Sequence, residues 1–178
     1  QMNFKGIAAH VFGIDPDARV LVNPYLDEGR VAFGEDVPFP DESFDLIFAD
    51  NVLEHLSEPD KVFAEIFRLL RPGGLFIGKT PNKWHYMPMI ARLTPHRFHK
   101  WVNKWRGREG DDVFPTVYRA NTEGDLRRLA SSADLKVNQI DYIEGRPEYL
   151  RMSVITYVLG MVYERIVSSV PLLAKFRI

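Results

Sequence analysis

Four polar residues follow directly on a short apolar run, and their types suit binding or proton transfer: Asp50, Asn51, Glu54 and His55. The run, residues 46–49, is typical of a strand in a parallel sheet that helices cover on both faces. In an open parallel α/β sheet, ligands bind beyond the carboxyl ends of the strands. The sequence therefore predicts a site at this strand end.

His55 is the candidate catalytic residue of this group. Histidine titrates near neutral pH and can take a proton from a hydroxyl group as a general base. The four-residue spacing from Asn51 to His55 places both on one face of a helical turn. The alternative is structural: His55 caps or buttresses the helix, and Glu54 makes a structural hydrogen bond.

A helix and a second strand are expected after this site. Ser57 is a candidate helix cap, and Pro59 suits a first helical turn. Pro72-Gly73-Gly74 is expected to stop the helix, and residues 75–77 to begin another apolar strand. The residues at helical spacing between these signals form one apolar face: Val62, Phe63, Ile66, Leu69 and Leu70.

Three segments occur in a characteristic order and spacing: PFPDESFDLIFADNVLEHL, EIFRLLRPGGLFI and TPN. Together they resemble the second half of a class I S-adenosylmethionine-dependent methyltransferase, within the broad group that methylates small molecules, lipids and glycans. The resemblance covers residues 11–82 well and the remainder loosely. It implies an α/β fold with a Rossmann-like, mostly parallel sheet and helices on both faces. Residues 1–178 are expected to form one such domain.

Asp15 is the residue that the resemblance assigns to the cofactor's ribose. Residues 8–14 are expected to form a strand, and Asp15 follows at its carboxyl end. An acidic residue at this place in the family accepts hydrogen bonds from the ribose hydroxyls of S-adenosylmethionine. Taken without the resemblance, Asp15 is better interpreted as a turn-forming residue before Pro16.

The resemblance assigns the loop before the strand at residues 46–49 to the adenine of the cofactor. Glu35, Asp36 and Val37 would surround the ring. The match is imperfect, because the family's usual acidic position falls on Phe33, and a solvated acidic loop is the alternative. Asp50 and Asn51 would face the cofactor's methionine end or the methyl acceptor.

The family's opening strand and glycine-rich turn are missing from the fourteen residues before Asp15, where Gly6 and Gly13 form no G-x-G pattern. We expect a sheet that is incomplete at the N-terminus and, if residues 171–178 begin the last strand, at the C-terminus too. The chain can be a fragment, receive the strand from another chain, or have a rearranged fold without cofactor binding. We favour the fragment.

Residues 83–121 lie where the family inserts substrate-recognition elements or a lid. Four side chains there are candidates for binding the acceptor: Trp84, Tyr86, Tyr118 and Arg119. Arg119 can pair with an acidic acceptor or bind helix carbonyls. The segment from Arg92 to Arg108 has six Lys or Arg and no acid. It suits a helix with a solvated basic face, a lid over an anionic acceptor, or attachment to an anionic membrane.

The composition of the chain limits the classes of partner that we expect it to bind. The chain has no cysteine, so it has neither disulfides nor thiolate metal ligands, and we expect no metal. Its formal net charge of −1 gives no reason to expect nucleic acid. Residues 152–163 carry no charge but are too few to span a bilayer, which favours a buried helix over interfacial attachment. We expect a cytoplasmic protein, with peripheral membrane contact and oligomerisation as open options.

The predicted function is enzymatic: methyl transfer from S-adenosylmethionine to a small-molecule, lipid or glycan acceptor, at oxygen. The acceptor would be small or membrane-associated. The chain alone can be inactive if the missing glycine-rich turn is needed to bind the cofactor. The alternative is a non-catalytic binding module that uses its basic aromatic region to bind an anionic membrane or nucleic acid.

Overall fold

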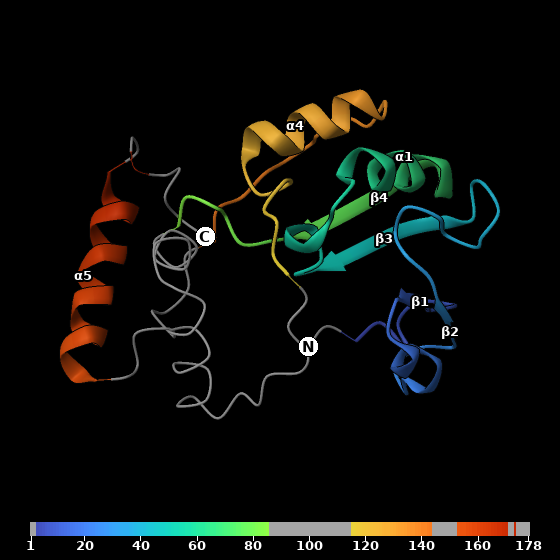
Figure 1. Cartoon of the computed structure of the whole chain (residues 1–178), viewed down its shortest axis with the longest axis horizontal. Coiled ribbons are helices and arrows are strands. Elements are labelled where there is room, and N and C mark those ends of the chain that lie inside the picture. The colour runs from blue at the N-terminus through green and yellow to red at the C-terminus, as the bar shows by residue number, and fades with distance from the viewer. Residues whose placement is uncertain (1–2, 86–114, 144–152, 171–172, 174–178) are drawn as a thin grey trace. The chain divides into compact units, whose positions relative to one another are not determined.

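The computed structural model describes residues 3–85, 115–143, 153–170 and 173. Figure 1 shows the elements of these residues in chain order. They are β1 (Phe12–Asp15), η1 (Ala18–Val22), β2 (Glu28–Val31), β3 (Phe44–Asp50), η2 (Leu53–His55), α1 (Pro59–Leu69), β4 (Leu70–Lys79), α4 (Glu123–Ser132) and α5 (Val154–Ser169).

The strands of the described residues form two separate pairs (Figure 1). β1 and β2 are parallel, with Phe12 opposite Glu28 and Asp15 opposite Val31. β3 and β4 run in the same direction as each other, because their flanking backbone hydrogen bonds advance together along both strands: Ser43 N–H to Leu69 O, then Asn51 N–H to Lys79 O. The fold is α/β with short parallel sheets, as expected for an incomplete Rossmann-like domain.

α1 presents the apolar face that the sequence predicts. Val62, Phe63, Ile66 and Leu69 are buried, and the Phe63 ring lies 5.9 Å from that of Phe76 on β4. The predicted place of Pro59 in the first helical turn is confirmed. The predicted cap, Ser57, is wrong, because the cap residue is Glu58, whose side chain makes no capping hydrogen bond.

The predicted helix stop at Pro72-Gly73-Gly74 was also wrong, since α1 ends at Leu69 and β4 begins at Leu70. The carbonyls of Arg68 and Leu69 accept hydrogen bonds from the N–H groups of Glu42 and Ser43. Backbone hydrogen bonds to the neighbouring segment therefore begin at the last residues of the helix. Gly73, at φ +84°, takes a left-handed conformation inside β4 that glycine adopts without steric cost.

The chain divides into two compact units. The first comprises Gln1–Phe48, Glu58–Ile77 and Leu129–Leu135, and the second comprises Ala49–Ser57, Gly78–Arg128 and Lys136–Ile178. The division runs through β3 and β4, whose last residues belong to the second unit. The expectation of one domain over residues 1–178 stays a prediction.

Two further predictions on the C-terminal half need correction. The moderate alternation of apolar residues over 135–143 predicts a strand, but these residues form none. Residues 152–163 were expected in a buried helix. α5 does form there, but most of its large apolar side chains are exposed. None of the helices in the described part of the chain is long and apolar enough to cross a membrane. Most of the last segment, residues 171–178, lies outside the described residues.

Candidate functional site

The ends of β3 and β4 meet in the second unit. The Asn51 N–H donates to the Lys79 carbonyl at 2.9 Å, and Lys79 Nζ lies 3.1 Å from Asp50 Oδ1. Asn51 Nδ2 donates to the same carboxylate oxygen at 2.9 Å. Asn51 has φ +54°, a left-handed conformation that asparagine tolerates better than most residues. A strained polar residue beyond a strand end is typical of a functional site.

Glu54 lies in η2 directly after this strand end, and it is 6% exposed. One oxygen of its carboxylate, Oε2, accepts a hydrogen bond from the Thr80 hydroxyl at 3.1 Å. Burial of a carboxylate is costly unless hydrogen bonds compensate it, so this contact is a requirement of the fold. It ties η2 to the residues that follow β4.

Asn121 extends the same network. Its Nδ2 donates to Thr80 Oγ1 at 2.7 Å and to the Pro81 carbonyl at 2.9 Å. The Lys83 N–H in turn donates to the Asn121 carbonyl at 3.0 Å. Asn121 is 1% exposed, and its Oδ1 has no hydrogen-bond partner within the described part of the chain. The Asn121 side chain therefore fixes the segment before α4 against the end of β4.

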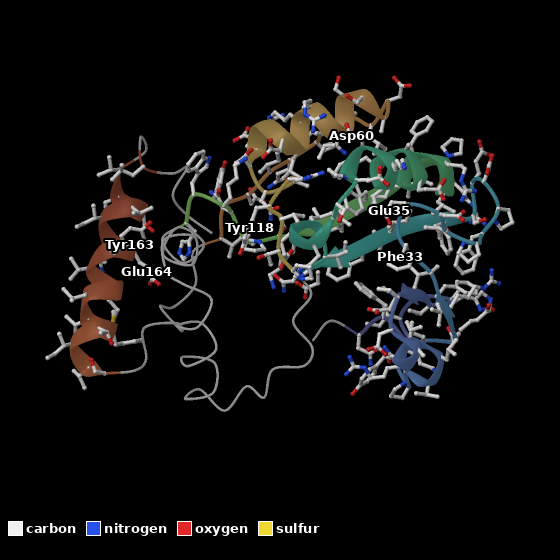
Figure 2. All side chains as sticks on the ribbon, viewed as in Figure 1. Phe33, Glu35, Asp60, Tyr118, Tyr163 and Glu164 are labelled. Atoms are coloured by element: carbon white, nitrogen blue, oxygen red, sulfur yellow. The ribbon has the colours of Figure 1, made fainter. Side chains whose placement is uncertain are left out.

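Residues 115–119 lie along η2. The N–H groups of Val117 and Tyr118 both donate to the Glu54 carbonyl, at 2.8 and 3.2 Å. Tyr118, labelled in Figure 2, is half-buried and has φ +52°. The Arg119 guanidinium donates to the Ser57 carbonyl at 2.7 Å, which corresponds to the carbonyl-binding alternative for this residue.

The His55 ring lies between this segment and Glu54. Nδ1 is 3.2 Å from the Pro115 carbonyl oxygen, and Nε2 is 3.9 Å from Glu54 Oε1. A carbonyl only accepts hydrogen bonds, so this contact favours the tautomer with the proton on Nδ1. Nε2 is then the nitrogen without a proton.

Trp84 and Tyr86 are the other two predicted acceptor residues. Trp84 is exposed, with the Lys83 ammonium 5.8 Å from its ring centroid. Lys83 itself pairs with Asp125 at 2.8 Å. Burial opposes ionisation of Asp125, but the hydrogen bonds from Lys83 and Thr122 outweigh it and lower the pKa of the carboxyl. Tyr86 lies outside the described residues.

In the first unit, Asp15 ends β1 and its carboxylate is exposed. Oδ1 accepts a hydrogen bond from the Asp17 N–H at 2.8 Å, which orients the group. Oδ2 has no hydrogen-bond partner among the described residues and can accept a hydrogen bond from a ligand hydroxyl. An oriented acceptor at the carboxyl end of a parallel strand fits a ribose diol.

Val37 is the buried member of the predicted adenine loop, in which Glu35 is half-buried and Asp36 exposed (Glu35 is labelled in Figure 2). The Val37 N–H donates to Glu65 Oε2 at 3.0 Å, and its carbonyl accepts from Arg68 at 3.0 Å. The Arg68 guanidinium holds the pKa of Glu65 below its usual range. The loop is thus fastened to α1 through Val37.

The alternative in which Glu54 makes a structural hydrogen bond is confirmed, but sequence reasoning did not identify Thr80 as its partner. It also missed the link from Thr80 to Asn121. Each link spans tens of residues, 26 from Glu54 to Thr80 and 41 from Thr80 to Asn121. No local spacing rule connects such positions, so a single sequence carries no signal for them.

Comparison with known proteins shows what the chain is similar to. Residues 2–78 match a family described as a methyltransferase domain. The chain is similar to methyltransferases over these residues. It is 36% identical over 101 residues to a probable S-adenosylmethionine-dependent methyltransferase of Mycolicibacterium smegmatis, covering 52% of the chain and 37% of that protein. It is also 36% identical over 133 residues to an uncharacterised methyltransferase of a Mycobacterium species, covering 69% and 53%.

Solved structures show the same fold at lower identity. The YcgJ protein of Bacillus subtilis has a TM-score of 0.54 at 16% identity, covering 93% of this chain and 69% of that one. A proposed methyltransferase of Bacillus halodurans has a TM-score of 0.50 at 19% identity, covering 73% and 55%. The chain spans about a third to a half of the length of the two mycobacterial relatives. The family implies S-adenosylmethionine as the cofactor.

Proposed function

We propose that this chain belongs to an enzyme that transfers a methyl group from S-adenosylmethionine to an oxygen atom of a small or membrane-associated acceptor. The arrangement around His55 supports oxygen as the acceptor atom. A hydroxyl group must lose its proton when it is methylated, and Nε2 of His55 is the basic nitrogen of the tautomer that the Pro115 carbonyl favours.

S-adenosylmethionine, when bound, supplies a methyl group activated by the positive charge on sulfur. In this proposal Asp15 accepts hydrogen bonds from the ribose hydroxyls. Glu35, Asp36 and Val37 surround adenine, with Val37 held in place by Glu65 and Arg68. These assignments rest on an oriented carboxylate at a strand end and on a loop that is fixed to α1.

Within the second unit, Asp50 and Asn51 are assigned to the methionine end of the cofactor or to the acceptor. His55 takes the hydroxyl proton on Nε2, which lies 3.9 Å from Glu54 Oε1. The acceptor is assigned to Trp84, Tyr86, Tyr118 and Arg119. Hydrogen bonds from the N–H groups of residues 117 and 118 to the Glu54 carbonyl hold Tyr118 and Arg119 beside η2.

Calorimetric titration of S-adenosylhomocysteine, the demethylated product, tests the cofactor assignment. The product is titrated into the 178-residue chain and into the longest form of the protein that its gene encodes. We expect micromolar binding by at least the longer form, weakened about tenfold or more in Asp15→Ala by the loss of a charged hydrogen-bond acceptor. The control, Asp141→Ala, removes an exposed carboxylate elsewhere and should bind normally.

The acceptor atom needs a second assay. Methyl-labelled cofactor is incubated with the enzyme and fractionated small molecules and lipids, and the labelled product is identified by mass spectrometry. A labelled methyl ether or ester supports the proposal, whereas a labelled amine or carbon overturns the assignment to oxygen. The absence of product binding to either form of the protein would overturn the enzymatic assignment itself.

A further inference from the structure

An ion pair lies at the carboxyl ends of β3 and β4, which are neighbours in one sheet (Figure 1). Asp50 is the last residue of β3 and Lys79 the last residue of β4, and Lys79 Nζ is 3.1 Å from Asp50 Oδ1. Both residues belong to the second unit. The Lys79 side chain is 62% exposed and that of Asp50 is 36% exposed. Opposite charges are therefore accessible side by side at the end of the sheet where ligands bind in α/β folds.

The Asp50 carboxylate has a defined orientation and one oxygen that can accept a further hydrogen bond. Oδ1 accepts a hydrogen bond from Asn51 Nδ2 at 2.9 Å and faces the Lys79 ammonium. Asn51 is itself held against β4, because its N–H donates to the Lys79 carbonyl at 2.9 Å. Oδ2 makes no hydrogen bond within the described part of the chain. It can therefore accept a hydrogen bond from a cationic group of a ligand.

The Lys79 ammonium can also bind a ligand. An ammonium has three N–H donors, and the contact of this one among the described residues is with Asp50. A flexible aliphatic stem carries the charge, so the ammonium can turn toward a ligand while the strand stays in place. An ion pair as exposed as this one adds little to stability. The stability of the fold therefore explains this pair poorly.

Two other cations, on segments next to these strand ends, are bound to protein groups. Lys83 pairs with Asp125 at 2.8 Å, and the Arg119 guanidinium donates to the Ser57 carbonyl at 2.7 Å. Lys79 is the cation that the strand ends themselves supply. The Asp50 carboxylate repels a negative group placed beside it unless a cation neutralises the repulsion. Lys79 is therefore the residue that allows a ligand carboxylate to bind at this place.

The amino-acid end of S-adenosylmethionine carries an α-ammonium and an α-carboxylate on the same carbon atom. These two charges are the complement of those on Asp50 and Lys79. We propose that Asp50 and Lys79 together bind this end of the cofactor, with the α-ammonium at Asp50 Oδ2 and the α-carboxylate at the Lys79 ammonium. Both contacts are charge-assisted hydrogen bonds, which are stronger than neutral ones.

This inference rests on the proposed function, which assigns Asp50 either to the methionine end of the cofactor or to the acceptor. It selects the cofactor and adds Lys79 as a second binding residue. Both side chains are positioning residues, because they hold the part of the cofactor that does not react. Their loss should therefore weaken binding of every ligand that has the complete amino-acid end, whether or not the ligand carries a methyl group on sulfur.

Calorimetric titration with three ligands tests the inference. S-adenosylhomocysteine carries both charges, its carboxamide keeps the ammonium but has no negative charge, and methylthioadenosine lacks the amino-acid end. Each is titrated into the 178-residue chain and into the longest form of the protein that its gene encodes. We expect S-adenosylhomocysteine to bind more tightly than either analogue. Lys79→Met should weaken its binding about tenfold, which corresponds to about 1.4 kcal/mol, and should not weaken that of the two analogues.

Lys61→Met is the matched control. The Lys61 side chain is also 62% exposed and also pairs with one carboxylate, that of Glu58 at 2.8 Å. It lies on α1, away from the ends of the strands. The control should bind all three ligands like the parent, and circular dichroism shows whether both variants keep the helix content of the parent.

Equal binding of S-adenosylhomocysteine by the Lys79 and Lys61 variants would overturn the inference. Equal weakening of S-adenosylhomocysteine and its carboxamide in Lys79→Met would overturn it as well, because Lys79 would then only orient Asp50. In both cases methylthioadenosine still binds, and the cofactor assignment of the proposed function stands. Failure of all three ligands to bind either form of the parent would overturn that assignment together with the inference.

Discussion

The Thr80 hydroxyl donates a hydrogen bond to the buried carboxylate of Glu54. The same hydroxyl oxygen accepts a hydrogen bond from Asn121, so it serves both neighbours at once. Glu54 also accepts two N–H groups from Val117 and Tyr118 on its backbone carbonyl. Through these contacts a single residue of η2 holds the end of β4 and the segment before α4 together. These contacts of Glu54 also position His55, which is the next residue of η2.

Thr80→Val should lower the free energy of unfolding by about 1–3 kcal/mol, since it leaves a buried carboxylate oxygen without its donor. Valine has nearly the same shape as threonine, so packing contributes little to the loss. Urea unfolding followed by circular dichroism measures the change. Thr116→Val is the control, because Thr116 is exposed and its substitution should stay within about 0.5 kcal/mol. Equal losses in the two variants would contradict a structural role for the Thr80 hydroxyl.

Arg68→Ala should destabilise the first unit by about 1–3 kcal/mol, because this side chain makes several charge-assisted hydrogen bonds at once. It binds the Glu65 and Asp41 carboxylates and the carbonyls of Val37 and Phe39. Arg68→Lys should lie between the parent and Arg68→Ala, because an ammonium keeps the charge but not the planar fork. Thermal unfolding of the three proteins measures the order.

The control for Arg68 is Arg127→Ala. Arg127 pairs with Glu123 at 2.8 Å on the exposed surface of α4, in an arrangement worth about 0.3–0.5 kcal/mol. A loss in Arg68→Ala no larger than in Arg127→Ala would show that the loop around Val37 does not depend on the guanidinium.

His85 should make stability depend on pH between its ordinary pKa of 6.5 and about 4. Burial lowers the pKa of its imidazole to about 4 in the folded chain. Below pH 6.5 the unfolded chain therefore binds a proton that the folded chain excludes, and stability falls as pH falls, by up to about 1.4 kcal/mol per pH unit. His85→Gln should flatten this part of the profile, measured by urea unfolding at several pH values.

Exposed His10 supplies the comparison for that experiment, as His10→Gln. An unchanged profile in His85→Gln would show that the imidazole is not shielded from water. A profile changed as much by His10→Gln would show that the effect is not specific to burial.

Local patterns predicted the parts of the fold that depend on neighbours in sequence. The apolar run before Asp50 forms β3, and the helical spacing from Val62 to Leu69 gives the buried face of α1. The end of α1 was missed because the bonds from Glu42 and Ser43 to the last helix carbonyls decide it. Turn residues in the sequence do not reveal where a neighbouring strand lies.

Tertiary context also explains the two errors in the C-terminal half. Alternating residues such as Leu135 and Val137 indicate a pleat, but a strand also needs a neighbour to bond with, and the described residues offer none. An apolar run such as residues 154–162 shows that a surface has to be covered without showing what covers it. The helix was therefore predicted correctly and its burial was not.

Asn51 allows backbone conformation to be separated from side-chain chemistry at the candidate site. At φ +54° an alanine would be strained, whereas a glycine would not, and both remove the amide group. Asn51→Ala should lose about 1 kcal/mol of stability and Asn51→Gly almost none. If the amide binds the cofactor, titration with S-adenosylhomocysteine should show weaker binding in both variants. Weakening in Asn51→Ala alone would show that the left-handed turn matters, and normal binding in both would remove Asn51 from the site.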